Sequence, residues 1–121
     1  TAKETFGGEG WAACHNLDLW RQTTPVNGEV KWSYWSMGGV WLTTHLYRHY
    51  LYTNDKIYLK NQAWPIMRET AKFCLSRLRE ENGVLYTDFS TSPENTFLDK
   101  DNRECALSES VTMDIALLWS A

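Results

Sequence analysis

The sequence contains no cluster of basic residues. Its 12 lysines and arginines are outnumbered by 15 aspartates and glutamates, and the formal net charge is −3. Nucleic-acid-binding surfaces concentrate positive charge, so this composition argues against such a partner. No apolar run approaches the roughly 18 residues that a membrane-spanning helix requires, and no signal peptide is visible at the start. We therefore expect neither a nucleic acid nor a membrane as a partner.

Cysteine is scarce, and its arrangement lacks the patterns of a disulfide framework or a thiolate zinc site. The three cysteines are an odd number and form no C-x-x-C pair, which favours buried, reduced thiols. His45 and His49 have the i, i+4 spacing of two metal ligands on one helical face. However, Arg48 lies between them and would repel a cation. We therefore expect no metal ion and no other cofactor.

Aromatic residues, by contrast, are abundant, with seven Trp, six Tyr and four Phe. Seven Trp in 121 residues is roughly four to five times the average usage of this amino acid. Trp favours packed cores and apolar recognition faces, including those that stack on sugar rings. With 43% hydrophobic and 22% charged residues, the chain is expected to fold, as one domain at most or as part of one.

Residues 1–36 show no sustained period, and helical periodicity begins at residue 37. Strand alternation of useful length and internal repeats of 33–45 residues are not evident. We predict helices over 37–52, 56–62 and 64–80. Residues 53–55 should break the first of these and supply N-cap candidates for the second, and 81–83, with Asn82 and the C-cap Gly83, should end the third. Another helix should begin after Ser108 or Ser110, with Val111, Ile115 and Leu118 as its apolar positions. The predicted fold class is all-α, with helical hairpins and long loops between them. Because the sequence stops within an apolar helical pattern, it is expected to be an interior portion of a larger domain.

The first candidate site lies between glycine-rich breaks, in residues 11–21. This segment combines an imidazole, an amide, a carboxylate and two indoles within eleven residues. Polar planar groups suit sugar hydroxyls and aromatic faces suit sugar C–H surfaces, so a carbohydrate site is one interpretation. The other is a buried network that supports the loop. The candidate substrate-binding residues here are Trp11, His15, Asn16, Asp18 and Trp20.

The second candidate site is the Ser/Thr-rich segment 90–97. Glu94 follows Pro93, and a loop of this kind can desolvate a carboxyl group and raise its pKa, as a general acid requires. Asn95 could hydrogen-bond a substrate hydroxyl. The alternative is an exposed glutamate in an ordinary turn. A third segment, around Gly38 and Gly39, indicates close helix packing.

Together these segments resemble glycoside hydrolase family 95, the family of inverting α-L-fucosidases that act mostly on α-1,2-linked fucose. The resemblance rests on W-x-x-x-H-N-x-D-L-W-R at 11–21, M-G-G-x-W-L at 37–42 and S-T-S-P-E-N at 90–95. The run 49–55 and T-M-D-I at 112–115 add to it. The motifs cover nearly the whole chain in the family's order.

The resemblance implies that residues 1–121 are a portion of a single (α/α)6 helical-barrel catalytic domain. It implies that Glu94 is the general acid, and that the base is an aspartate outside these residues, assisted by two asparagines also outside them. The chain alone is then expected to be inactive. The implied partner is a fucosylated oligosaccharide or glycan, and the implied location is secreted, periplasmic or cell-surface.

Two alternatives to a fucosidase remain open. One is a non-catalytic helical carbohydrate-binding or scaffold domain, which would bind sugar as an isolated chain. The other is a different (α/α) barrel glycosidase or lyase, which would cleave uronic-acid or glucosyl substrates and ignore fucose.

Overall fold

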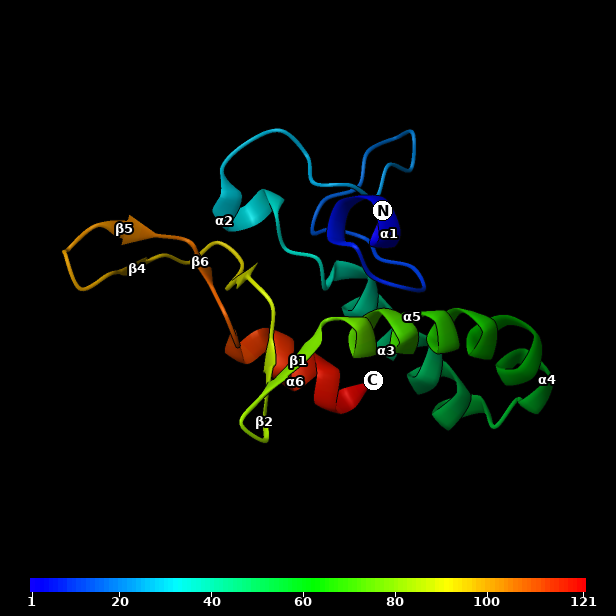
Figure 1. The fold of residues 1–121 in the computed structure, drawn as a ribbon. Coiled ribbons are helices and arrows are strands. Elements are labelled where there is room, and N and C mark those ends of the chain that lie inside the picture. The colour runs from blue at the N-terminus through cyan, green and yellow to red at the C-terminus, as the bar shows by residue number, and fades with distance from the viewer.

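A computed structural model describes all residues from 1 to 121 and combines helices with short β ladders (Figure 1). The helices are α1 (Ala2–Phe6), α2 (Val30–Ser33), α3 (Gly38–Thr53), α4 (Lys56–Tyr58), the π-helix η1 (Leu59–Ala63), α5 (Trp64–Ser76) and α6 (Thr112–Ser120). The strands are β1 (Leu78–Glu81), β2 (Val84–Thr87), β3 (Ser90–Thr91), β4 (Phe97–Leu98), β5 (Glu104–Cys105) and β6 (Leu107–Ser108).

Helices α3 and α5 form a helical hairpin on which α6 packs (Figure 1). Asn54 ends α3 in the left-handed conformation with φ of 51°. Asp55 then begins α4, because its carboxylate accepts hydrogen bonds from the amides of Ile57 and Tyr58, both at 2.9 Å. The expected break and cap at 53–55 are therefore confirmed.

The return arm of the hairpin is continuous from α4 through η1 to α5. The π-helical turn Leu59–Ala63 comes just before Pro65, which sits in the first turn of α5. Proline lacks the N–H that continues the hydrogen-bond ladder of an α-helix and crowds the preceding turn, and the single π turn lies at this interruption. The predicted separate piece at 56–62 is thus part of one long, locally widened helix.

The all-α fold class is wrong, because three two-stranded antiparallel ladders are present: β1–β2, β3–β6 and β4–β5. The main error concerns Asn82 and Gly83, which were expected to cap a helix ending near residue 80. Helix α5 instead ends at Ser76, and these two residues form the turn of the β1–β2 hairpin, with φ of 53° and 80°. Asn-Gly is a strong signal for a hairpin turn because both central residues of a type I′ turn require positive φ.

Helix α6 begins later than expected, and neither Ser108 nor Ser110 is its N-cap. Its N-cap is Val111, without a side-chain cap. Ser108 lies in β6, and the Ser110 hydroxyl instead accepts a hydrogen bond from the amide of Thr87 at 3.3 Å. Of the predicted apolar stripe, Val111 is buried while Ile115 is 49% exposed.

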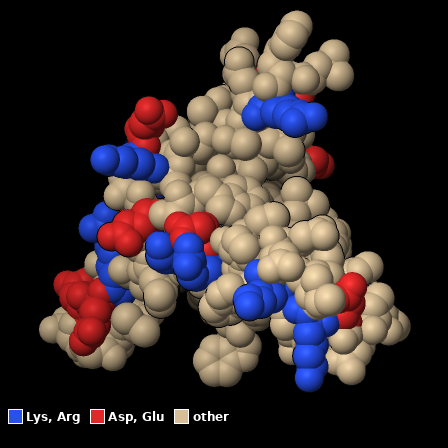
Figure 2. Space-filling model, turned by 90° about the vertical axis from the view of Figure 1, so that its right-hand side faces the viewer, with Lys and Arg blue, Asp and Glu red and all other residues tan.

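The buried core is small, with 24 of the 121 residues buried. One apolar cluster joins α1, the segment before α3, and helices α3, α5 and α6; its members are Ala2, Ala12, Trp35, Met37, Val40, Phe73, Cys74 and Leu117. Many large apolar side chains stay exposed, and Figure 2 shows acidic and basic groups interspersed among wide uncharged areas. None of the helices combines the length and apolar character needed to cross a membrane.

Candidate functional site

The short helix α2 contacts both candidate segments through backbone oxygens. The carbonyl of Lys31 accepts a hydrogen bond from the amide of Glu94 at 2.9 Å. The carbonyl of the next residue, Trp32, lies 3.0 Å from Nδ1 of His15. The two motifs, nearly 80 residues apart in sequence, therefore bond consecutive carbonyls of one helical turn.

Glu94 lies in a short loop, Ser92–Thr96, which we call the acid loop. The two residues before it are buried: Ser90 is 2% exposed and Thr91 is fully buried, and both pair with β6. Glu94 itself is exposed, so this chain alone does not provide the desolvation expected of the loop, and its φ is 63°. A left-handed backbone is uncommon for a glutamate and persists only where its surroundings hold it. The bond to Lys31 is one such restraint on Glu94.

Asn95 is exposed beside Glu94 and shapes the same loop. Its amide N–H donates to the carbonyl of Ser92 at 2.9 Å, and its Nδ2 donates to the carbonyl of Pro93 at 3.2 Å. The second bond uses one of the two side-chain N–H donors. The side-chain oxygen and the other donor remain available to a ligand.

His15 and Asn16 are half-buried in the other motif. The His15 ring meets the indole of Trp35 edge to face, with 5.8 Å between ring centres, and the His15 amide donates to the Trp35 carbonyl at 3.0 Å. Because one His15 ring nitrogen already bonds Trp32, only the other is available to a ligand.

Asp18 and Trp20 occupy the exposed turn of this segment. Asp18 Oδ1 accepts hydrogen bonds from the amides of Trp20 at 2.9 Å and Gln22 at 3.0 Å. This carboxylate therefore organises the turn, in which Arg21 takes a left-handed φ of 61°. The indole of Trp20 is 83% exposed and presents a free aromatic face to solvent.

Trp11, unlike the exposed Trp20, contacts the helical hairpin. Its indole N–H donates to the carbonyl of Ile66 at 3.3 Å, and its ring packs on Gly39 at the start of α3. A Cβ added at Gly39 would lie 2.5 Å from the Trp11 ring, so only glycine permits this approach. In this chain, Trp11 joins its loop to the helical hairpin.

Charged groups gather around Lys31, next to the acid loop. Its ammonium group forms an ion pair with Glu29 at 2.7 Å. The pKa of Lys31 is raised, chiefly by this hydrogen bond and charge, with further contributions from the charges of Glu104 and Glu94. A fixed positive charge thus lies near three carboxylates on the surface of the candidate site.

Beneath the site lies a buried carboxylate that the sequence reasoning did not single out. Asp114 in α6 is 1% exposed, and its Oδ1 accepts a hydrogen bond from the Trp35 indole at 2.9 Å. Burial raises the pKa of Asp114, whereas the hydroxyl of Ser90, the indole of Trp35 and the charge of Arg77 act in the opposite direction. An acidic residue in the otherwise apolar T-M-D-I segment was the available signal.

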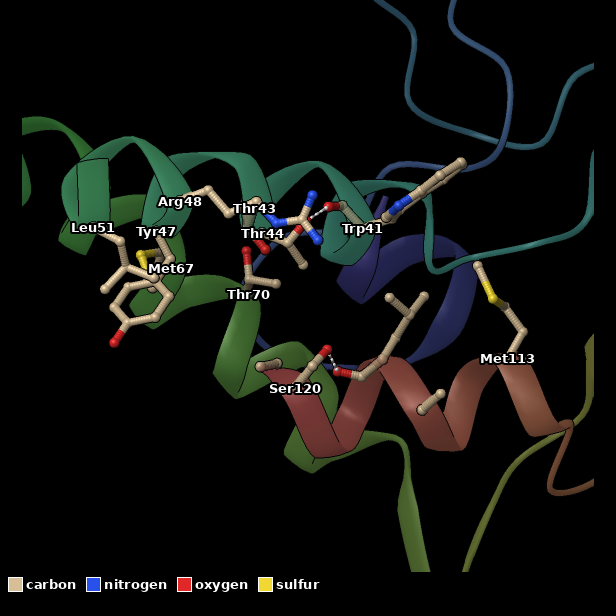
Figure 3. Close-up of a pocket in the computed structure, with 13 residues that line it drawn as sticks. Trp41, Thr43, Thr44, Tyr47, Arg48, Leu51, Met67, Thr70, Met113 and Ser120 are labelled. Carbon is tan, nitrogen blue, oxygen red and sulfur yellow. Dashed lines mark hydrogen bonds between the residues drawn. The ribbon is translucent and has the colours of Figure 1, made fainter. Parts of the chain in front are cut away.

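A cavity of about 540 Å³ lies elsewhere, between α3, α5 and α6 (Figure 3). It is mostly apolar and is lined by Trp41, Met67, Met113 and Leu117 among others. None of the candidate site residues lines it, so its size does not make it the active site. No group of three or more His, Cys, Asp or Glu side chains is arranged as metal ligands.

Comparison with known proteins defines the class first. Residues 1–121 match the model of the glycosyl hydrolase family 95 catalytic domain, and the chain therefore belongs to this family.

Within this family, the chain is similar in sequence to two proteins named as fucosidases. It is 41% identical to alpha-L-fucosidase 2 of Arabidopsis thaliana over 119 residues, which is 98% of this chain and 14% of that protein. It is 25% identical to the probable alpha-fucosidase A of Aspergillus niger over 100 residues, which is 78% of this chain and 12% of that protein. The chain thus spans about one seventh of the length of these relatives.

Proposed function

We propose that this chain forms the acid-bearing part of an α-L-fucosidase that hydrolyses terminal α-L-fucosyl residues, in particular α-1,2-linked ones, with inversion. Family membership and the two fucosidase relatives support this substrate class. The observation that carries the role of Glu94 is its exposed carboxyl on a backbone held at φ of 63°. Strained, well-held backbone at an accessible carboxyl is typical of functional positions.

In the proposed mechanism, Glu94 donates its proton to the glycosidic oxygen as the bond from that oxygen to the anomeric carbon breaks. A water molecule attacks the anomeric carbon from the opposite face and gives up its proton to a second carboxylate. The two carboxyl groups of an inverting enzyme stand roughly 6.5–9.5 Å apart, which leaves room for that water. We assign the base to an aspartate outside these 121 residues, with two assisting asparagines that also lie outside them.

Some of the candidate binding residues have groups that are free to contact a sugar, whereas others already bond the protein. Trp20 offers an exposed ring for a sugar face, and Asn95 and Asn16 offer polar groups for its hydroxyls. His15 can contribute its second ring nitrogen. Asp18 and Trp11 already bond the protein, so we assign them the support of the sugar-binding loop.

The test is Glu94→Gln in the full-length protein that contains this chain. With a 2′-fucosyl oligosaccharide, whose leaving group needs a proton, kcat should fall roughly 10²- to 10⁴-fold. With α-L-fucosyl fluoride, whose leaving group departs without protonation, most activity should remain. The matched control is Glu104→Gln, an exposed carboxylate near Lys31, which should leave both rates unchanged.

Wild-type rates of Glu94→Gln on the oligosaccharide would overturn the assignment of the general acid. The stereochemistry is tested separately, because inversion of an α-fucoside releases β-L-fucose first. Proton NMR during the first minutes of hydrolysis should show the β anomer before mutarotation. Initial release of the α anomer would contradict the proposed inverting mechanism.

A further inference from the structure

Asp114 is an unusual residue for the interior of this chain, because no cation pairs with it. The guanidinium of Arg77, whose charge acts on Asp114, instead forms an ion pair with Asp88 at 3.5 Å and donates to the carbonyls of Phe6 and Phe89, both at 3.3 Å. Burial of a carboxylate without an ion-pair partner destabilises a fold. A neutral side chain would therefore serve packing better than Asp114 does.

One neighbour of Asp114 leads into the acid loop. Strand β3, which carries Ser90, pairs with β6, and β6 comes just before α6, whose first turn carries Asp114. The Ser90 hydroxyl is buried without a hydrogen-bond partner of normal geometry and is one of the groups that lower the pKa of Asp114. Ser90 and Thr91 are almost completely buried, and the ladder from β3 to β6 fixes their backbone. From Thr91 the chain needs only three further residues to reach Glu94. The start of the acid loop is thus held by β6, the strand that leads into the helix turn of Asp114.

The other neighbour of Asp114 leads to the opposite motif. The Trp35 indole that donates to Asp114 also contacts the His15 ring, and its backbone carbonyl accepts the His15 amide. The buried carboxylate therefore bonds the support of the His15 segment from the helix that follows β6, the strand that holds the start of the acid loop. Its two oxygens can accept from an indole N–H and a hydroxyl at once, which an apolar side chain cannot do.

We propose that Asp114 is a positioning residue, which holds the acid loop in register with the His15 segment so that Glu94 faces the glycosidic oxygen. This inference rests on the proposed role of Glu94. It predicts a loss of general-acid efficiency, rather than of substrate binding or folding, when the carboxylate is removed. Misplacement of a catalytic group by about 1 Å can lower a rate as much as 10²-fold.

The test compares Asp114→Asn and Ser90→Ala with wild type in the full-length protein. For both variants, kcat on a 2′-fucosyl oligosaccharide should fall by about tenfold or more, with KM changed by less than about twofold. Hydrolysis of α-L-fucosyl fluoride should stay close to wild type. The control is Leu117→Ala, a buried apolar residue of the same helix. It should reduce both activities in equal proportion, through the fraction of folded enzyme.

A double variant separates positioning from an independent effect. If Asp114 acts through Glu94, then adding Asp114→Asn to Glu94→Gln should lower oligosaccharide hydrolysis no further. Full additivity, or equal losses on the two substrates for both Asp114→Asn and Ser90→Ala, would overturn the inference. If Glu94→Gln itself shows no preference for the fluoride, the proposed function fails and the inference fails with it. If Glu94→Gln shows that preference and the other two variants do not, only the inference fails.

Discussion

The indole nitrogen of Trp35 lies 2.9 Å from Oδ1 of Asp114, although 79 positions separate the two residues in sequence. This bond joins the segment before α3 to the first turn of the last helix. Both side chains are about 99% buried, so water does not compete for the contact. The bond therefore joins helix α6 to Trp35, on which the His15 ring packs.

Trp20 should contribute to substrate binding and not to folding. Because its ring is 83% exposed, Trp20→Ala should change the free energy of unfolding by less than about 0.5 kcal/mol. Loss of a sugar-stacking face should raise KM for the fucosyl oligosaccharide by about 3- to 10-fold in steady-state kinetics. Leu19→Ala is the control, since this neighbour is 95% exposed and has no aromatic face. Equal KM values for the two variants would exclude Trp20 from the binding site.

Asp18 should act on the same site indirectly, through the turn that it organises. Asp18→Ala removes the acceptor for the amides of Trp20 and Gln22, and hydrogen bonds to a charged group are worth about 1.5–3 kcal/mol. Hydrogen exchange of these two amides should accelerate at least tenfold, with global stability little changed. Asp18→Asn keeps an acceptor oxygen and should restore part of the protection. Unchanged exchange in Asp18→Ala would show that the turn does not depend on the carboxylate.

Gly83 should be required by the β1–β2 turn for its backbone alone. It has φ of 80°, and a Cβ added there would meet no atom within 4 Å. Gly83→Ala should therefore destabilise the hairpin by about 1 kcal/mol through backbone strain and not through a clash. Faster hydrogen exchange of strand amides in β1 and β2 would report this. The control, Asn82→Gly, fits the same positive φ and should stay within a few tenths of a kcal/mol of wild type.

Asp88 should make stability depend on acid pH. A hydrogen bond from Arg79 at 2.8 Å is the main cause that lowers the pKa of Asp88, with help from the Phe89 amide and Arg77. A carboxyl whose pKa is lowered on folding stabilises the fold above its unfolded pKa, about 3.9, and loses this effect as the pH falls through the lower, folded value. Asp88→Asn should thus be less stable than wild type at pH 7, and the gap should shrink below pH 4.

Urea unfolding at pH 7, 5 and 3 measures this dependence on Asp88. Asp101→Asn is the control, because its ion pair with Arg103 is exposed and contributes little to stability. A gap between wild type and Asp88→Asn that stays constant from pH 7 to pH 3 would rule out the proposed linkage.

The sequence predicted the elements that depend on residues close to one another along the chain. Helix α3, the cap at Asp55 and the role of Gly39 in close packing follow from periodicity, side-chain chemistry and residue size. Strands β3 to β6 have only two residues each, too short for any alternation to be visible. Asn82 and Gly83 satisfy both a helix cap and a hairpin turn, and only the partner strand decides between the two.

The candidate site was predictable in its residue types but not in its connections. Acidic and amide groups near aromatic residues in irregular segments marked the two motifs. The contact between Glu94 and Lys31 depends on a backbone oxygen, which has no signature in sequence. The contacts of Asp114 could not be predicted for a similar reason, because its partner Trp35 lies 79 positions away along the chain.

Helix α2 has a consequence for how this site can change during evolution or engineering. Lys31 and Trp32 hold the two motifs by main-chain oxygens, which every amino acid possesses. Substitutions on α2 that preserve its helical turn therefore leave these bonds intact while they alter the charge and shape next to the acid loop. The turn is thus a suitable position for a library of variants that changes the surroundings of Glu94 while the backbone of the acid loop stays in place.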